Sequence, residues 1–455
     1  MGPVIAPPDA PRPGPRAWHR RRCGSRAIVA LAVLAALAAG GCGTAAEEGT
    51  STDARDAAVG TAAGTGTVDA TGVSAQDWPT YGFDNARTRW NPALRHRPPF
   101  TTRWTLRTGG LLEFPPSVAG GMLYVAQLRG RFFAVDAKTG AIRWRKSTGH
   151  CSAASPAIAG GVVFASFLAP YPCPKGLFDG GGYVYAWDAA TGERKWVAQL
   201  PPVESSPLVQ DGVVYVGAWD DRVYALDAAT GAVRWSTAVD NQIVSSAAWI
   251  DAAQAGGSPA IAIGTNGGSL YALDAATGEI RWKAESTSIP GYGREYFYAT
   301  PTVAYGRVFI GNTDGWVYAY GARSGKLVWA KRAGTYVYTG LVAAGQVIYA
   351  GTYDGRVIAY DAATGDELWS IAAPGAVHGA MVLMDGLLYF STCSGCGRNG
   401  VRASKRGPDG IHAVDISTHK LVWSDPDGKY SPLVADAERV YLVGVGTVRG
   451  TTSAG

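Results

Sequence analysis

Cysteine residues are the first candidates for chemistry in this chain of 455 residues. Cys393 and Cys396 form a Cys-x-x-Cys pair, a spacing found in redox motifs and metal sites. Gly397 follows the pair and no second ligand pair comes after it, so a haem or metal site is disfavoured. We expect a loop-closing disulfide there, with thiol exchange as the alternative. In an oxidising compartment, Cys151 and Cys173 would form a second disulfide that holds a long loop.

Aromatic and acidic side chains form a second set of candidates, suited to binding. They occur in short segments, and residues 292–298 are the richest in aromatics. Aromatic and polar groups that converge on a concave surface are what a ligand site needs. We expect a binding mouth built by Glu113, Glu204, Tyr292, Arg294, Tyr296, Tyr298, Tyr338, His378 and Tyr430, with Phe114, His150 and Tyr336 nearby. The alternative is that these side chains only fill a channel and satisfy turns.

Signatures of the common catalytic classes do not stand out in the sequence. We find no Ser-His-Asp order, no pair of carboxylates at catalytic spacing and no glycine loop that would cradle a phosphate. The many glycines fall where turns are expected. We therefore predict no catalytic residues and no metal ligands.

The elements that must position these side chains come from one repeated phrase, Asp-x-x-Thr-Gly-x-x-x-Trp. Its copies span residues 136–144, 188–196, 227–235, 274–282, 321–329, 361–369 and 415–423. Two copies are degenerate: Gly321 replaces the Asp, and His419 replaces the Gly, where we expect a strained turn residue. With one isolated residue the tryptophans form a series, Trp104, Trp144, Trp196, Trp235, Trp282, Trp329, Trp369 and Trp423.

The spacing of these tryptophans is typical of a β-propeller. Successive intervals are 40, 52, 39, 47, 47, 40 and 54 residues, which suits one four-stranded blade apiece with loops of different length. Within residues 206–235, short runs of β-branched and aromatic residues alternate with turn residues, which indicates strands. The large indoles would pack neighbouring blades together and have a structural role.

The two ends of the repeat predict how the ring closes. Residues 431–434 and 440–445 supply inner strands with no Trp phrase after them, while residues 102–107 supply an outer strand alone. Joined, these ends complete one more blade and leave no exposed sheet edge. We therefore predict an all-β, eight-bladed β-propeller over residues 77–450, with a tail at 451–455. Seven blades is the alternative.

The N-terminal region predicts export. Residues 1–41 combine an arginine-rich start with an uncharged run at 27–39, which is too short to span a bilayer, and read as a signal peptide. The residues before Cys42 resemble a bacterial lipobox, although Ala39 stands where Leu is usual, so we expect lipidation of Cys42. An ordinary signal with a stray cysteine is the alternative. Residues 42–76 are rich in Gly, Ala, Thr and Ser and predict a flexible linker.

The charge of the mature chain argues against nucleic acid as a partner. The net charge is +5, but residues 1–26 contain six arginines and one acid, and the remainder holds 35 basic and 35 acidic residues. Nucleic-acid binding depends on clustered Lys and Arg, which such a balance does not suggest.

The extended phrase Ala-x-Asp-x-x-Thr-Gly-x-x-x-Trp resembles the tryptophan-docking motif of pyrroloquinoline-quinone (PQQ) dehydrogenases. It is equally similar to propeller lipoproteins such as the assembly subunit of the outer-membrane β-barrel insertion machinery. The segment from Trp78 to Arg89 also resembles the opening segment of that family. The resemblance covers about residues 77–450 and implies the fold, whereas the repeated residues are packing residues and say little about chemistry.

The enzymes of this family imply further features: two adjacent cysteines, a calcium site of Glu with Asn or Asp, and a catalytic Asp. This chain has no Cys-Cys pair and is shorter than is usual for those enzymes. We therefore expect no cofactor, with PQQ and calcium as the alternative.

These observations favour a non-catalytic scaffold. We expect a monomeric, extracytoplasmic propeller, tied to the cell membrane only by its lipid anchor, or to the outer membrane if the organism has one. It would bind an envelope protein or peptide. A PQQ- and calcium-dependent dehydrogenase and a propeller that senses a small ligand at residues 292–298 are the two alternatives.

Overall fold

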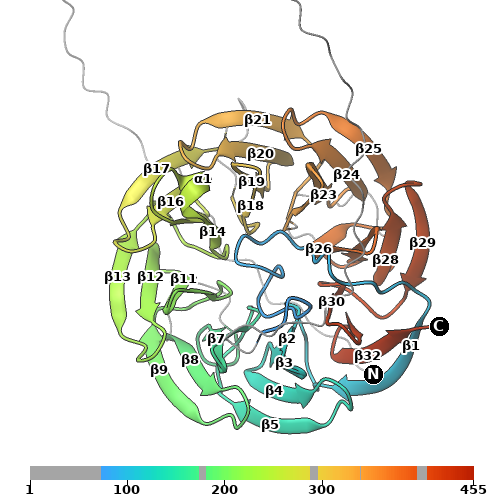
Figure 1. The fold of residues 1–455 in the computed structure, drawn as a ribbon, viewed down its shortest axis with the longest axis horizontal. Coiled ribbons are helices and arrows are strands. Elements are labelled where there is room, and N and C mark those ends of the chain that lie inside the picture. The colour runs from blue at the N-terminus through green and yellow to red at the C-terminus, as the bar shows by residue number, and fades with distance from the viewer. Residues whose placement is uncertain (1–72, 174–180, 287–295, 339, 397–406, 455) are drawn as a thin grey trace, which may run out of the picture. The chain divides into compact units, whose positions relative to one another are not determined.

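Eight four-stranded antiparallel sheets form a ring in the computed structural model, which describes residues 73–173, 181–286, 296–338, 340–396 and 407–454 (Figure 1). The first four blades are β2(Ser117–Ala119), β3(Met122–Gln127), β4(Arg131–Asp136) and β5(Ile142–Ser147); β6(Ala157–Ala159), β7(Val162–Phe167), β8(Gly182–Asp188) and β9(Arg194–Leu200); β10(Leu208–Gln210), β11(Val213–Gly217), β12(Arg222–Asp227) and β13(Val233–Ala238); and β14(Ala248–Ile250), β15(Ala260–Gly264), β16(Ser269–Asp274) and β17(Ile280–Glu285).

The next three blades repeat this order. They are β18(Thr302–Ala304), β19(Arg307–Gly311), β20(Trp316–Gly321) and β21(Leu327–Arg332); β22(Val342–Ala344), β23(Val347–Gly351), β24(Arg356–Asp361) and β25(Glu367–Ala372); and β26(Val377–Met384), β27(Leu387–Thr392), β28(Gly410–Asp415) and β29(Lys420–Asp425). A single-turn helix, α1(Ala252–Ala255), lies between β14 and β15. Among the described residues no helix is long and apolar enough to cross a membrane.

The eighth blade joins the two ends of the chain, as predicted. Its sheet order is β1-β32-β31-β30, with β30(Leu433–Ala435), β31(Val440–Val443), β32(Thr447–Ser453) and β1(Phe100–Arg107). The predicted tail at 451–455 is therefore wrong in part, because residues up to Ser453 pair with β1. The linker boundary also shifts: Val73 already packs against a buried cluster of the first two blades.

Six of the eight tryptophans in the series dock onto the glycine-containing turn of the following blade. Six of the indole Nε1–H groups donate to an alanine carbonyl there, at 2.9–3.1 Å, as Trp196 does to Ala228. The indole lies against the motif glycine, so that a Cβ at Gly231 would be 2.6 Å from Trp196. That glycine also has φ +75°, a conformation that other residues adopt at a cost. The glycine is thus required both by its backbone and by its neighbour.

The two positions that lack this glycine show other solutions. His419 takes the glycine's place at φ 58°, and its ring stacks on Trp369 with 4.8 Å between centroids. Trp423 faces the composite blade, where the chain ends replace the turn, and Phe100 packs edge-on against it at 5.3 Å. His419 is thus a turn residue with left-handed backbone, as predicted, and its ring also packs against Trp369.

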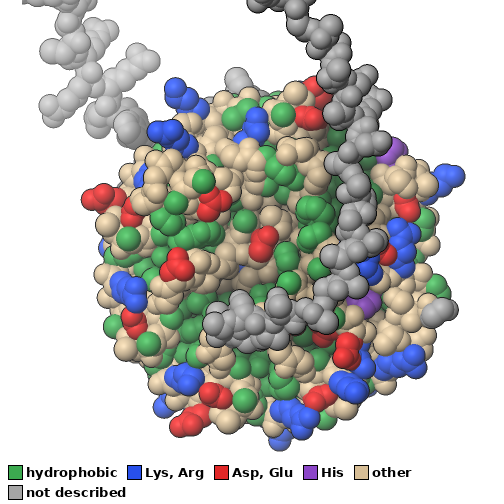
Figure 2. Space-filling model, in the orientation of Figure 1, with side chains coloured by type: hydrophobic (Ala, Val, Ile, Leu, Met, Phe, Trp, Pro, Cys, Tyr) green, Lys and Arg blue, Asp and Glu red, His purple; other side chains and the backbone are tan. Residues whose placement is uncertain are grey.

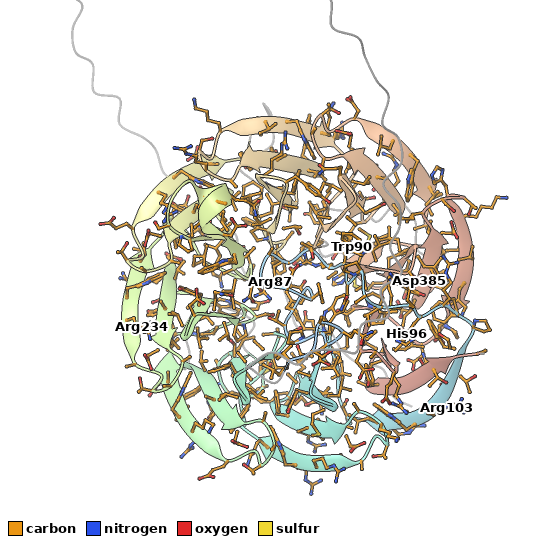
Figure 3. All side chains as sticks on the ribbon, in the orientation of Figure 1. Arg87, Trp90, His96, Arg103, Arg234 and Asp385 are labelled. Carbon is orange, nitrogen blue, oxygen red and sulfur yellow. A yellow bond between two sulfur atoms is a disulfide. The ribbon has the colours of Figure 1, made fainter. Side chains whose placement is uncertain are left out.

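The segment over residues 77–90, here called the axial segment, crosses the centre of the ring (Figure 1). It hydrogen-bonds to the innermost strand of seven blades, from the pair formed by Trp78 and Val118 to the bond between the Leu383 N–H and the Arg89 carbonyl. Arg87 lies near the centre (Figure 3) and donates to three carbonyls and to the Thr80 hydroxyl. The axial segment therefore connects the blades from the inside.

Lys and Arg side chains gather mainly toward the edge of the face in Figure 2.

Two glycines of the third blade test the docking of the indole. We expect Gly231→Ala to lower the free energy of unfolding by roughly 2–5 kcal/mol, from left-handed backbone strain and overpacking against Trp196. Gly212→Ala is the matched control, because Gly212 has φ +73° and open space around its Cβ position. It should cost only about 1–2 kcal/mol. Equal shifts of the two denaturant midpoints would show that the indole contact adds nothing.

Candidate functional site

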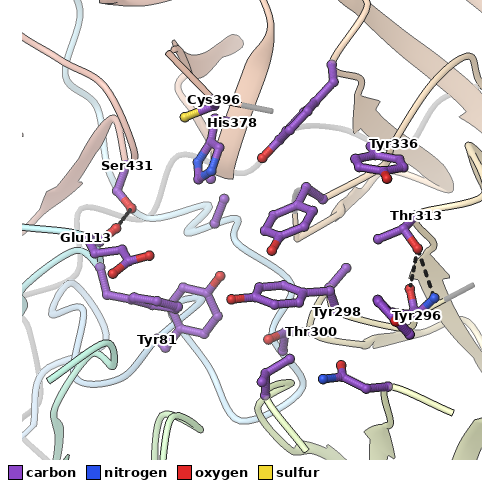
Figure 4. A pocket seen from close by; sticks show the side chains of 18 of the residues that line it. Tyr81, Glu113, Tyr296, Tyr298, Thr300, Thr313, Tyr336, His378, Cys396 and Ser431 are labelled. Atoms are coloured by element: carbon purple, nitrogen blue, oxygen red, sulfur yellow. Dashed lines mark hydrogen bonds between the residues drawn. The ribbon is translucent and has the colours of Figure 1, made fainter. Parts of the chain in front are cut away.

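A cavity of about 500 Å³ opens at the end of the ring where the chain enters each innermost strand (Figure 4). Its floor includes Tyr81 of the axial segment. Five of the predicted mouth residues line it: Glu113, Tyr296, Tyr298, Tyr338 and His378. Phe114 and Tyr336 line it too. Part of the predicted mouth therefore lies at one concave site.

The remaining predicted residues lie around this cavity or elsewhere. Glu204 stands behind Tyr298, whose hydroxyl donates to its Oε1 at 2.9 Å, and Tyr430 packs edge-on against His378. His150 packs against Tyr183 and is not among the lining residues. Tyr292 and Arg294 lie outside the described residues.

The predicted aromatic run does not all face the cavity. Tyr296 is 50% exposed at the cavity and Tyr298 is half-buried in it, whereas Phe297 is fully buried in the core between the blades. Alternation along an extended chain places neighbouring side chains on opposite sides. Phe297 therefore has a packing role.

Sequence reasoning missed the side chains that come from a second set of loops. Asn266, Thr313, Tyr353 and Cys396 line the cavity from the connections between the second and third strands of their blades. Antiparallel pairing brings those connections to the same end of the blade as the start of the first strand. That rule would have identified them once the strands were assigned.

Hydrogen bonds between blades hold the mouth segments in place. Ser155 N–H donates to the Ser206 hydroxyl, Ser206 N–H to the Ser246 hydroxyl, and Ser246 N–H to the Thr300 hydroxyl, at 2.9–3.2 Å. All four side chains are buried. The cavity is therefore set by the rigid inner part of the ring.

A series of aromatic rings forms one wall. Tyr298 and Tyr338 stack with 4.1 Å between centroids, Tyr338 lies 5.4 Å from Tyr353, and Tyr353 lies 5.6 Å from His378. Their order around the cavity follows the order of three successive blades. Rings held against one another in this way present fixed π faces and edges to a ligand.

Two carboxyl groups share this site. Burial, and then the nearby Glu113 carboxylate, raise the pKa of Glu204 to about 7, although hydrogen bonds from Tyr298 and from the Trp219 indole at 3.0 Å oppose the change. Burial also raises the pKa of Glu113. Glu204 is therefore partly protonated at neutral pH.

His378 is neutral at physiological pH. Burial, and then the charge of Lys429, lower its pKa to about 4. Its Nδ1 is buried and finds no hydrogen-bond partner among the described residues. The ring contributes a polar aromatic surface and no positive charge.

Both predicted disulfides are present. Cys151 pairs with Cys173, and Cys393 pairs with Cys396, with Cα–Cα distances of 5.5 and 5.4 Å. The second pair lies at the cavity, since Cys396 lines it and Cys393 is buried.

Comparison with known proteins places the chain in a family. A family model described as outer membrane protein assembly factor BamB matches residues 81–169, 176–315 and 313–441. The chain belongs to this family of PQQ-like β-propellers. The crystal structure of BamB from Moraxella catarrhalis has the same fold, with a TM-score of 0.63 and 17% identity over 78% of this chain and 99% of that one.

Curated relatives match shorter stretches and differ in function. The serine/threonine-protein kinase AfsK of Streptomyces griseus is 38% identical over 85 residues, 17% of this chain and 9% of the kinase. Polyvinylalcohol dehydrogenase of Pseudomonas sp is 26% identical over 34% of this chain and 28% of the enzyme. BamB of Burkholderia pseudomallei is 29% identical over 29% of this chain and 32% of the relative. The matched stretches are less than a third of each relative.

The raised pKa of Glu204 predicts how stability depends on pH. The folded protein binds a proton more tightly than the unfolded chain, so this group's contribution to stability falls as the pH rises from about 4.5 to about 7. In Glu204→Gln this loss disappears. We expect the free energy of unfolding of the variant, relative to that of wild type, to increase by roughly 2 kcal/mol from pH 5 to pH 8.

His378 has a lowered pKa and contributes the opposite slope, so the difference between variant and wild type is the quantity to measure. Glu193→Gln, at an exposed turn residue, is the control. A Glu204→Gln difference that stays constant across this range would mean that Glu204 titrates normally.

Proposed function

We propose that this protein is a non-catalytic scaffold of the bacterial cell envelope that binds a partner protein or peptide at its mouth cavity. The observation that carries the proposal is the rigid aromatic cavity, built on the inner strands and open at one end of the ring. Aromatic side chains that are already held in place make good anchors for a partner, because little conformational entropy is lost on binding. Family membership with BamB supports a role in assembly at the envelope.

The location and the anchor belong to the same proposal. The predicted signal peptide and the lipidation of Cys42 fall outside the described residues, and the predicted lipid anchor would hold the propeller at a membrane surface outside the cytoplasm. The composition of residues 43–72, which favours a flexible linker, supports a head that reaches away from that surface.

The described cavity residues do not fit the PQQ and calcium of the enzymatic relatives. PQQ is a polycarboxylate, and none of the described lining residues is Lys or Arg, while Glu113 is an acid. The described residues also hold no group of three His, Cys, Asp or Glu side chains arranged to bind a metal ion. These features support the non-catalytic proposal over a dehydrogenase.

Site-specific photocrosslinking in cells tests the proposal. A photoreactive phenylalanine analogue replaces Tyr296 at the cavity or Val233 on the outer strand β13, each 50% exposed in the folded protein. We expect a discrete protein adduct from position 296, lost when Tyr298→Ala is added, and none from position 233. The unfolding midpoint of each variant shows that the propeller is intact.

Two results would contradict the proposal. One is the same set of adducts from both positions, which would mean that the mouth is not selective. The other is no adduct from position 296 together with calcium-dependent PQQ binding and dye-linked oxidation of alcohols by the purified protein. That second result would favour the dehydrogenase.

A further inference from the structure

The charge and the aromatic walls of the mouth cavity together indicate what kind of group it takes. We propose that it binds an organic cation, an alkylammonium or guanidinium group, carried by a lysine or arginine side chain of a partner or by a free amine. This inference rests on the proposed binding function of the mouth and specifies its chemistry.

The carboxyl groups supply the first argument. Glu113 points into the cavity in Figure 4, and its carboxyl oxygens accept no hydrogen bond from any described residue. Glu204 lies behind Tyr298 and uses its two oxygens to accept from Tyr298 and Trp219. A partly buried carboxylate is costly without a partner, and a bound cation would provide one.

The rings supply the second argument. The faces of aromatic rings are negative, and several rings around one space attract an ammonium or guanidinium group more strongly than a neutral one. Tyr298, Tyr338 and Tyr353 come from two successive blades and bring their hydroxyl-bearing rings into the same cavity. An anion in the same cavity would be disfavoured, because the aromatic faces and the Glu113 carboxylate are both negative.

The positive charges nearest to the cavity, Arg89 and Lys429, are not among its described lining residues. The guanidinium of Arg89 lies 5.0 Å from the centroid of the Tyr81 ring and donates to the carbonyls of Arg87 and Leu341. Asp84, in the same segment, lies close enough to both arginines for their charges to act on it. At the rim, Lys429 is 3.3 Å from Asp409. Arg89 is fully buried, and its Nε and Nη2 have no hydrogen-bond partner among the described residues. Lys429 is paired with Asp409, and the described cavity wall carries no basic side chain of its own.

The dimensions of the cavity agree with such a group. A volume of about 500 Å³ lies within the range of ordinary ligand pockets and exceeds what one side chain needs. A lysine or arginine side chain could enter with its aliphatic stem along the tyrosine rings while its charge reaches Glu113.

Calorimetric titration of the purified protein with a matched pair of ligands tests this inference. The pair is N-acetyl-lysine methylamide and N-acetyl-norleucine methylamide, which differ only in the terminal ammonium group. We expect the lysine derivative to bind at least about tenfold more tightly. A comparison of the affinities for butylammonium and for a peptide with a single lysine distinguishes a free amine from a partner side chain as the natural ligand. Equal affinities favour the free amine, and tighter binding of the peptide favours a partner protein.

Variants separate the two contributions. Glu113→Gln should weaken lysine-derivative binding about five- to tenfold, while the exposed Glu193→Gln leaves it unchanged. Tyr338→Phe keeps the ring face and should retain most of the affinity, whereas Tyr338→Leu should lose about three- to tenfold. The unfolding midpoint of each variant is measured alongside.

Equal binding of the lysine and norleucine derivatives would overturn the inference, as would unchanged affinity in folded Glu113→Gln. In either case the crosslink from position 296 could still form, so the proposed binding function would stand without the cation. Loss of the crosslink with intact amine selectivity would instead point to a small-molecule ligand.

Discussion

The contact between a tryptophan of the repeat and the glycine of the next blade, made by six of the eight tryptophans, is the constraint on which the rest of the structure depends. A single four-stranded blade has two apolar faces and cannot bury them alone, so its stability comes from its neighbours. The indole covers one such face, donates one hydrogen bond and leaves no room for a Cβ on the facing turn, as at Trp144 and Gly192. Repetition of this contact sets the angle between blades and hence the width of the central channel.

The axial segment converts that channel into a cavity with a floor. Innermost strands of three residues, such as β2 and β18, present free backbone groups to the axis, and a bond from the axial segment satisfies one of them in each of seven blades. Two fully buried arginines, Arg87 and Arg89, serve this purpose with donors that reach carbonyls of several blades, and Gly340 leaves space for Arg89. Burial and the neighbouring Arg89 lower the pKa of Arg87 to about 9. The axial segment also contributes Tyr81 to the lining of the mouth cavity.

The sequence was sufficient for the fold because the repeated residues are the packing residues. Trp235 and Gly278 predict a blade interface by their spacing alone, and the strands between them follow from alternation. The cavity was predictable only in part. Glu113 and Tyr298 were found because they precede innermost strands, whereas Tyr353 was missed because it lies in a different loop that pairing brings to the same end. The raised pKa of Glu204 depends on burial and on Glu113, which comes from another blade, so no local pattern could reveal it.

The separation between scaffold and site is consistent with similar stretches of sequence in proteins named as BamB, a kinase and a dehydrogenase. Docking residues lie on the outer strands and turns of each blade, and they can stay the same while the residues before the innermost strands change. Several of these loops contribute side chains to a shared space, so replacing one Lys or Arg by Glu inverts the charge that a ligand meets at little cost to the blade interfaces. In this chain the described loops place tyrosines and carboxyls there. The ligand specificity of such a ring is therefore set by the side chains that several loops place around a common axis. The sign of the charge in the cavity most directly distinguishes a site for cations from a site for a polycarboxylate quinone.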